Sequence, residues 1–272
     1  VTLLAQKKVN DFFTVTERFP EARMNIRKLK LLDHLNLYYK NESSAAMLNE
    51  NFANDVPGAR ANDSYDAVRV DSYNELSYPT QILDFLNINP FIGSRQTFYS
   101  DDANGNDNVI RDVFNTGLDL YTRLYKIHDI ETDFLGLDIH DIRHLIIPSA
   151  QYAYIREPNL RPEELKQFDE IDTFRMKNAV NLSLQHKLQT KRRDESGRRK
   201  TVDLLSFIIS SEYTIKDDFG TDNKLQDVEY DLEIRPYDWM YIDADARLDR
   251  EKKVFDTFNA DLYIDKKGEF RP

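Results

Sequence analysis

Apolar and polar residues alternate along residues 227–264. The apolar residues occupy even-numbered positions, and mostly polar residues fill the odd positions between them. The apolar series is Val228, Tyr230, Leu232, Ile234, Met240, Ile242, Ala244, Ala246, Leu248, Phe258, Ala260, Leu262 and Ile264. A period of two residues puts alternate side chains on opposite faces of a β-strand, and no helix produces it. The stretch therefore predicts three consecutive strands with one apolar and one polar face.

The turns between these strands are constrained by the same parity. The apolar residues remain even-numbered across Pro236-Tyr237-Asp238 and again across residues 249–252. Residues that face each other on neighbouring strands share a side of the sheet, so each hairpin loop should contain an odd number of residues. We therefore expect three-residue turns at both places, barring a bulge.

Strand-like runs also fill the rest of the chain. Polar turns separate them, and the clearest is residues 101–108, which contain Asn104-Gly105 and almost nothing that could pack. Residues 173–190 form the longest clean run, whereas residues 157–170 predict a long loop in which residues 161–166 suit one helical turn. We expect about twelve strands in an all-β, antiparallel up-and-down meander.

The length of these runs bears on the membrane question. A strand needs roughly 9 to 11 residues to cross a tilted path through a bilayer, and most runs reach that length. The chain also has 15 Tyr and 16 Phe for aromatic girdles at the membrane interfaces. These features predict part of a large transmembrane β-barrel wall. A soluble β-sandwich or an elongated sheet is the alternative that the pattern leaves open.

Composition narrows the function. The net charge of -11 argues against nucleic acid as a partner. With no cysteine, the chain has no disulfide framework and no thiolate metal site. It also lacks a Gly-rich phosphate loop and a Gly-x-Ser-x-Gly nucleophile motif. We therefore expect no enzyme activity and no cofactor.

An ordered set of short motifs is more specific than the pattern. The motifs are Phe19-Pro20-Glu21, Val68-Arg69-Val70-Asp71, Tyr78-Pro79, Ile88-Asn89-Pro90, Thr97-Phe98-Tyr99, residues 143–154, residues 168–172, Lys177-Asn178-Ala179-Val180, residues 233–236 and Trp239. In this order the chain resembles the barrel of the lipopolysaccharide-assembly outer-membrane protein, the organic solvent tolerance family also called LptD. The similarity spans most of the chain.

The resemblance implies a non-enzymatic translocon in the cell outer membrane. In that family a large barrel receives lipopolysaccharide from a periplasmic bridge protein and releases it sideways into the outer leaflet, and a plug lipoprotein fills its lumen. Residues 1–272 would be a partial outer-membrane β-barrel domain, the middle and later wall, since neither the N-terminal jellyroll nor the terminal barrel strands can be identified. The alternatives are a generic outer-membrane porin or transporter, and a soluble β-sandwich binding module.

One basic run stands out in this acidic chain. Residues 191–200 lie between two long predicted strands and contain four arginines, Arg192, Arg193, Arg198 and Arg199. These arginines are candidates for contact with lipid or lipopolysaccharide phosphates through charge-assisted hydrogen bonds. The plainer interpretation is a solvated hairpin tip.

Two further groups have the spacing of chemical sites. His140 and His144 stand four residues apart beside two aspartates, as metal ligands on a helix would. The local sequence is a loop that enters a strand, however, so we expect no metal site. Asp243 and Asp245 share a polar strand face, an arrangement that would also suit paired acid-base carboxylates. The interior of a water-filled barrel explains such residues more simply.

Overall fold

Each strand of the protein pairs with a strand close to it in the chain, and together they form one antiparallel sheet. The computed structural model describes residues 1–10, 12–53, 64–193 and 196–265. The strands are β1 (Thr2–Gln6), β2 (Val15–Lys30), β3 (Tyr38–Asn51), β4 (Tyr65–Ser77), β5 (Thr80–Ile82), β6 (Leu86–Asp101), β7 (Asp107–Tyr121), β8 (Leu124–Thr132), β9 (Ile139–Ile155), β10 (Lys177–Arg193), β11 (Arg199–Asp217), β12 (Lys224–Leu225), β13 (Val228–Tyr237), β14 (Met240–Asp249) and β15 (Val254–Ile264). The expected all-β meander is confirmed.

The sheet has 15 strands, and 12 of them form its continuous path, β1-β2-β3-β4-β6-β7-β9-β10-β11-β13-β14-β15. The other three are short additions: β5 pairs with β6, β8 with β9 and β12 with β11. Because β7 and β8 both pair antiparallel with β9, they run along it in one direction as a single interrupted strand. The expected number of about twelve strands therefore corresponds to the continuous path.

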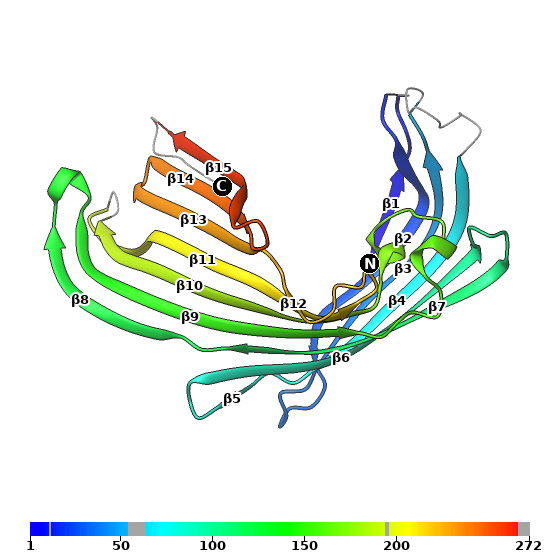
Figure 1. Ribbon diagram of the computed structural model, residues 1–272, viewed down its shortest axis with the longest axis horizontal. Helices are drawn as coiled ribbons and strands as arrows, with labels where there is room; N and C mark the ends of the chain where they lie inside the picture. Colours follow the sequence, from blue (N-terminus) through cyan, green and yellow to red (C-terminus); the bar gives the residue numbers. More distant parts are fainter. Residues whose placement is uncertain (11, 54–63, 194–195, 266–272) are drawn as a thin grey trace.

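The sheet curves into an open trough (Figure 1). Its two outer strands are β1 and β15, which lie at opposite ends of the strand order. Among the described residues, neither pairs with a further strand on its outer side. An open edge exposes unpaired backbone groups, which a closed barrel would satisfy. The geometry is that of a barrel wall rather than of a closed barrel.

The connections alternate between the two ends of the strands. One end carries the longest connection, residues 156–176, which folds back into the concavity of the trough (Figure 1). We call residues 156–176 the inward segment and this end the segment end. The opposite end, the tip end, carries the short turns at 133–138 and 238–239, and there β10 ends at Arg193 and β11 begins at Arg199.

The two faces of the sheet follow the predicted parity. Away from the bulges, the even-numbered residues of β10 and β13–β15 share the convex, outward face, and register joins Leu182 to Ala150 and Ile242 to Leu262. The side chains of Leu182 and Leu262 are 47% and 57% exposed there. Residues on the other face, which include Asn181, Ser183, Glu233, Asp243 and Asp261, line the concave side. The predicted division into an apolar and a polar face is confirmed.

The turn lengths expected near the C-terminal hairpins are wrong. Tyr237 pairs with Met240 around the two-residue turn Asp238-Trp239, and Asp249 pairs with Val254 around residues 250–253. Each hairpin contains a register shift, between Ile234 and Tyr237 in one and beside Leu248 in the other. A bulge inserts one extra residue into one strand, so it preserves the shared parity with an even-numbered turn.

Among the described residues, regular helix is limited to three short 3-10 turns. They are η1 (Phe134–Gly136), η2 (Pro162–Glu164) and η3 (Glu170–Thr173). The expected helical turn within residues 161–166 corresponds to η2. Across the described part of the chain, no helix has both the length and the apolar character needed to cross a membrane.

We predict that the outward face contacts lipid. In the intact, reconstituted protein, spin labels at Leu182 and Leu262 should be strongly relaxed by a lipid-phase quencher, while labels at Asn181 and Asp261 should not. Leu232→Arg should impair assembly, because an Arg at the lipid face costs about 2 to 4 kcal/mol near the bilayer midplane. The matched control Glu233→Arg should be tolerated. Equal quenching at all four labels would contradict the assignment of faces.

Candidate functional site

The inward segment contributes most of the buried polar contacts on the concave face of the sheet, so we describe the candidate site around it. It leaves β9 after Ile155, crosses the concave face and returns at Lys177. Two caps organise it locally: the Asp169 carboxylate accepts a hydrogen bond from the Ile171 N–H, and the Arg161 N–H donates to Glu164. Asp side chains favour such caps because they satisfy N–H groups that a short turn leaves free.

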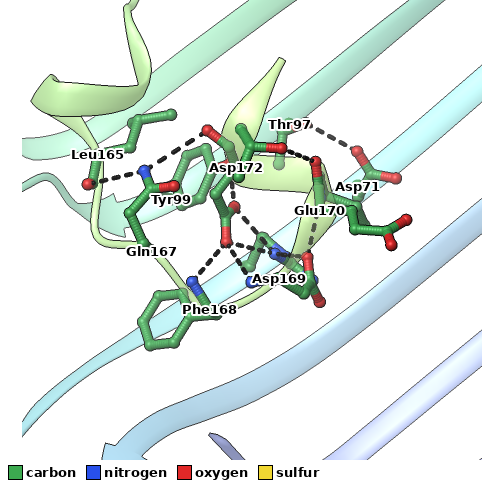
Figure 2. A network of polar contacts seen from close by, with 12 residues as sticks. Asp71, Thr97, Tyr99, Leu165, Gln167, Phe168, Asp169, Glu170 and Asp172 are labelled. Carbon is green, nitrogen blue, oxygen red and sulfur yellow. Dashed lines mark hydrogen bonds and ion pairs between the residues drawn. The ribbon is translucent and has the colours of Figure 1, made fainter. Parts of the chain in front are cut away.

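Asp172 is the centre of the contacts between the segment and the wall (Figure 2). Its side chain is fully buried, at 0% exposed. The carboxylate accepts hydrogen bonds from Arg69 on β4 at 2.9 and 3.0 Å and from the Tyr99 hydroxyl on β6 at 2.6 Å. It also accepts from the N–H groups of Phe168 and Asp169. A buried carboxylate is stable only when its oxygens are satisfied in this way.

Arg69 supplies the positive charge that this carboxylate needs. Its guanidinium, 1% exposed, also forms a two-pronged contact with Asp169, at 2.8 and 2.7 Å. Such fork-to-carboxylate pairs are the strongest type of side-chain hydrogen bond. Arg18 on β2 reaches the same Asp169 carboxylate at 2.8 Å. Three elements, β2, β4 and the inward segment, therefore meet at one ionic cluster.

Arg111 on β7 binds the backbone carbonyl groups at the C-terminal end of η3. Its guanidinium donates to the carbonyl oxygens of Ile171 at 3.1 Å and Asp172 at 3.0 Å, and to that of Phe174. The carbonyl groups at the end of a helical turn lack intrahelical partners and carry partial negative charge. Arg111 therefore compensates the end of η3, and it is itself fully buried in doing so.

An apolar contact completes the docking. The Phe168 ring packs against Ala46, Leu48 and Ala67 and meets the Tyr65 ring edge-on at 5.3 Å between centroids. These small and apolar side chains belong to the inward faces of β3 and β4. The tight cluster buries Phe168 to 7% exposure. The wall thus gains a local hydrophobic core where the segment covers it.

A polar cavity of about 450 Å³ remains between the segment and the wall. Its lining includes guanidinium groups of Arg18, Arg23 and Arg95 and the carboxylates of Glu21 and Asp71. The Thr97 hydroxyl donates to Asp71 at 2.7 Å, so this carboxylate too is held in place (Figure 2). Positive and negative side chains lie close to one another in the lining of this cavity. Such a polar lining is compatible with a cavity filled by water.

The electrostatics of Asp169 favour its charged form. Burial raises the pKa of this carboxyl, but the hydrogen bond and charge of Arg69, together with the Ile171 N–H and Arg18, outweigh burial and hold the pKa below its usual value. The charged carboxylate is therefore the form that ties the segment to the wall.

The predicted basic run lies at the tip end, and its four arginines differ in their surroundings. Arg192 is 5% exposed and donates to the backbone carbonyls of Leu137 at 3.2 Å and of Pro236, with Asp238 at 3.4 Å. It thereby ties three hairpin tips together. Arg193 is exposed, Arg198 donates to Ser196, and Arg199 lies 3.0 Å from His140. Residues 194 and 195 of the run lie outside the described residues.

The other candidate groups are dispersed. His140 contacts Glu131 at 3.2 Å and Asp138 at 3.1 Å, whereas His144 pairs with His186 instead. In the described ranges, no three His, Cys, Asp or Glu side chains are grouped as metal ligands. Asp243 faces Glu233 and Asp261 in the strand pairing, and Asp245 faces Asp231. These carboxylates form an acidic inward surface.

Sequence reasoning missed the residues that dock the inward segment. They are Arg69, Tyr99, Arg111, Asp169 and Asp172. Two signals were present: arginines at inward positions of long strands, and the run Phe168-Asp169-Glu170-Ile171-Asp172 with carboxylates spaced for a cap. Neither signal identifies which strand meets which loop.

Comparison with known families decides the identity. The model of the LptD protein family matches residues 11–250, which includes the strands from β2 to β14 and the inward segment. The chain belongs to the LptD protein family. No curated protein matches the chain significantly. The resemblance carried by the ordered motifs is thus confirmed.

Membership gives the function at the level of the family. LptD proteins take part in lipopolysaccharide transport and outer-membrane assembly, and they are lipid transport and assembly proteins rather than known enzymes. The open antiparallel wall, apolar outside and polar inside, agrees with an outer-membrane barrel of this family.

We predict that Asp172→Ala releases the inward segment. Removing one partner of a buried ion pair leaves Arg69 uncompensated, which typically costs about 3 to 5 kcal/mol. Trypsin should then cut the folded, intact protein after Lys166, which is tied to Asp101 and the Asp66 carbonyl, at least about tenfold faster. Glu170→Ala is the matched control, because Glu170 is an exposed acid in the same turn. Equal cleavage of both variants would contradict the role of Asp172.

We also predict the pH dependence of docking. The pKa of Asp169 is lower in the folded protein than in the unfolded chain, so its contribution to stability is present above about pH 4 and is lost as pH falls through the folded pKa. Hydrogen exchange of residues 165–172, corrected for the intrinsic rate, should stay protected from neutral pH to about pH 4 and lose protection below it. Loss of protection between pH 5 and 7 would contradict this assignment.

Proposed function

We propose that this chain forms part of the wall of an outer-membrane barrel that delivers lipopolysaccharide to the outer leaflet. The observation that carries the proposal is the family match over residues 11–250 on a sheet whose faces are apolar outside and polar inside. Residues 1–272 are then a partial barrel domain, and transport proceeds by binding and guidance without bond chemistry. Further wall strands complete the barrel beyond the open edges of β1 and β15.

We infer the orientation of the wall in the membrane from the lengths of its connections. Outer-membrane barrels have short periplasmic turns and longer extracellular loops. On this rule the segment end, with residues 156–176, faces the outside, and the tip end, with the turns at 133–138 and 238–239, faces the periplasm. The inward segment then narrows the lumen from the outer side.

Two protein partners are part of the proposal, one in the lumen and one at the periplasmic end of the wall. A plug lipoprotein would occupy the concave side, where the acidic surface around Asp243 and Asp261 remains uncovered by the inward segment. A periplasmic bridge protein would meet the tip end and pass lipopolysaccharide to it. Both partners are proposed from the family, and the open, polar concave face supports them because it leaves room for a hydrated occupant.

The basic run is suited to receive the phosphates of arriving lipopolysaccharide. Arg193, Arg198 and Arg199 project from the β10–β11 tip, and Arg192 fixes that tip to its neighbours. Arginine binds phosphate by charge-assisted and often two-pronged hydrogen bonds. Arg192 therefore contributes rigidity, and the other three contribute the direct contacts.

We predict that replacing Arg193, Arg198 and Arg199 with Gln in the full-length protein slows lipopolysaccharide delivery at least about fivefold, because a single basic group near an anionic lipid surface is worth about 1 kcal/mol. The measurement is the rate at which new lipopolysaccharide becomes accessible to a modifying enzyme at the cell surface. Arg123→Gln, an exposed arginine outside the run, is the control.

A depletion experiment tests the function itself. Cells depleted of the intact protein should accumulate lipopolysaccharide within the cell envelope, beneath the outer leaflet. Surface lipopolysaccharide should recover when the wild-type protein is supplied. Normal surface lipopolysaccharide after depletion, together with ion conductance of the purified protein in planar bilayers, would support a porin instead. Recovery of the intact protein from the soluble fraction would favour a soluble β-sandwich.

A further inference from the structure

Among the described residues of the outward face, one group of basic side chains gathers near the tip end. Lys126 and His128 on β8, His144 on β9 and His186 on β10 gather there, and we call these four residues the outward basic patch. Three of the five histidines of the chain belong to it. Nothing in the inward segment or the basic run uses these residues.

Strand register brings the patch together. Lys126 pairs directly with His144, and His128 pairs with Ile142. His144 also pairs with Leu188, and His186 pairs with Ile146, so the two histidines lie diagonally across β9 and β10. Their even positions put them on the same face as Leu182.

The two imidazoles are in direct contact. His144 Nε2 lies 3.1 Å from His186 Nδ1, and the stacked rings have centroids 5.4 Å apart. Both rings are half-buried, whereas Lys126 and His128 are exposed. The two imidazole rings therefore hold their ring nitrogens at a fixed position. The ammonium group of Lys126, on a flexible side chain, lies beside them.

The surroundings favour an anion over a metal ion. The residues that pair directly with the patch, apart from its own members, are Ile142, Ile146, Leu188 and Phe207, and none of them is acidic. The carboxylate of Glu131, which follows on β8, contacts His140 at 3.2 Å. A cation bound at the two imidazoles would be repelled by the ammonium group of Lys126. An anion is attracted by the same group and can accept hydrogen bonds from it.

The ligand must also suit an apolar setting. Leu124, 53% exposed, lies two residues before Lys126 on the same face, and the apolar side chains of Leu184 and Leu188 flank His186. A long lysine side chain can lie along apolar surface and place its charge at the level of lipid headgroups. A ligand with an acyl chain beside a phosphate matches this arrangement, and a free ion does not.

We propose that the outward basic patch binds the phosphate group of an anionic phospholipid in the periplasmic leaflet of the outer membrane. The proposal rests on the membrane insertion and orientation proposed above. The lipid would lie against β8–β10 on the outside of the wall, apart from the path of lipopolysaccharide. It would anchor the tip end of these long strands at the membrane surface.

The test uses the intact protein in nanodiscs of mixed phosphatidylcholine and phosphatidylglycerol. After transfer to detergent, native mass spectrometry counts the phosphatidylglycerol molecules that stay bound. Lys126→Gln should lower retention about fivefold, the effect of one basic group at an anionic lipid surface. The double variant His144→Gln/His186→Gln should lower it further.

The control is the pair Lys30→Gln/His34→Gln, the same residue types at another exposed position near the tip end. It should retain lipid as the wild type does. Equal retention in the patch variants and the wild type would overturn the proposal. So would displacement of the lipid by inorganic phosphate at equal concentration, which would indicate a free-phosphate site, or stoichiometric zinc binding lost in the double variant.

This test separates the lipid site from the proposed function. If surface delivery of lipopolysaccharide is normal in the patch variants while retention of phosphatidylglycerol falls, the patch is a lipid site independent of transport. If the depletion experiment fails but retention still depends on Lys126, the transport function is wrong and the lipid site stands. Loss of heat-modifiable mobility in gels would identify any variant that fails to fold.

Discussion

The structure depends on a constraint that a single-layer sheet cannot avoid. In the part of the chain that the structure describes, no second layer of strands covers either face, so each face must match its own surroundings along the whole wall. Alternation of side chains is the property of a strand that allows two different faces, and a shift of one residue would exchange them. The bulges in β13–β15 show how strictly the register is kept, because the turns change length while the faces do not.

The inward segment is where the wall departs from this simple scheme. A polar concave face is normally in contact with water. The side chains of Asp172, Arg69 and Arg111 lie on this face but are almost completely shielded from solvent. Desolvation of these charges is unfavourable by itself, and the arrangement is stable because the carboxylate, the guanidinium groups and the carbonyl ends of η3 satisfy one another. Phe168 adds an apolar contact that excludes water from the same place.

The sequence predicted local features well and long-range partners poorly. The period of two residues identified the strands, their faces and the polar odd positions such as Glu233 and Asp243, since these depend on neighbouring residues only. It did not reveal that Asp172 would meet Arg69, which lies 103 positions away in the chain. The same holds for Arg192, whose position in a basic run suggested a phosphate contact, whereas its burial against Leu137 and Pro236 depends on three hairpin tips.

The inward segment lies far along the chain from the strands that it contacts. This separation bears on the order in which the parts of the wall fold. The segment follows β9, but its contacts come from β2, β3, β4, β6 and β7. These strands must already be in register for the guanidinium groups of Arg69 and Arg111 to converge on η3. Contacts between residues so far apart close large loops, which is entropically expensive until the intervening strands have paired. Docking of residues 156–176 is therefore a late step, and a docked segment is a sign that this half of the wall has been built in the correct register.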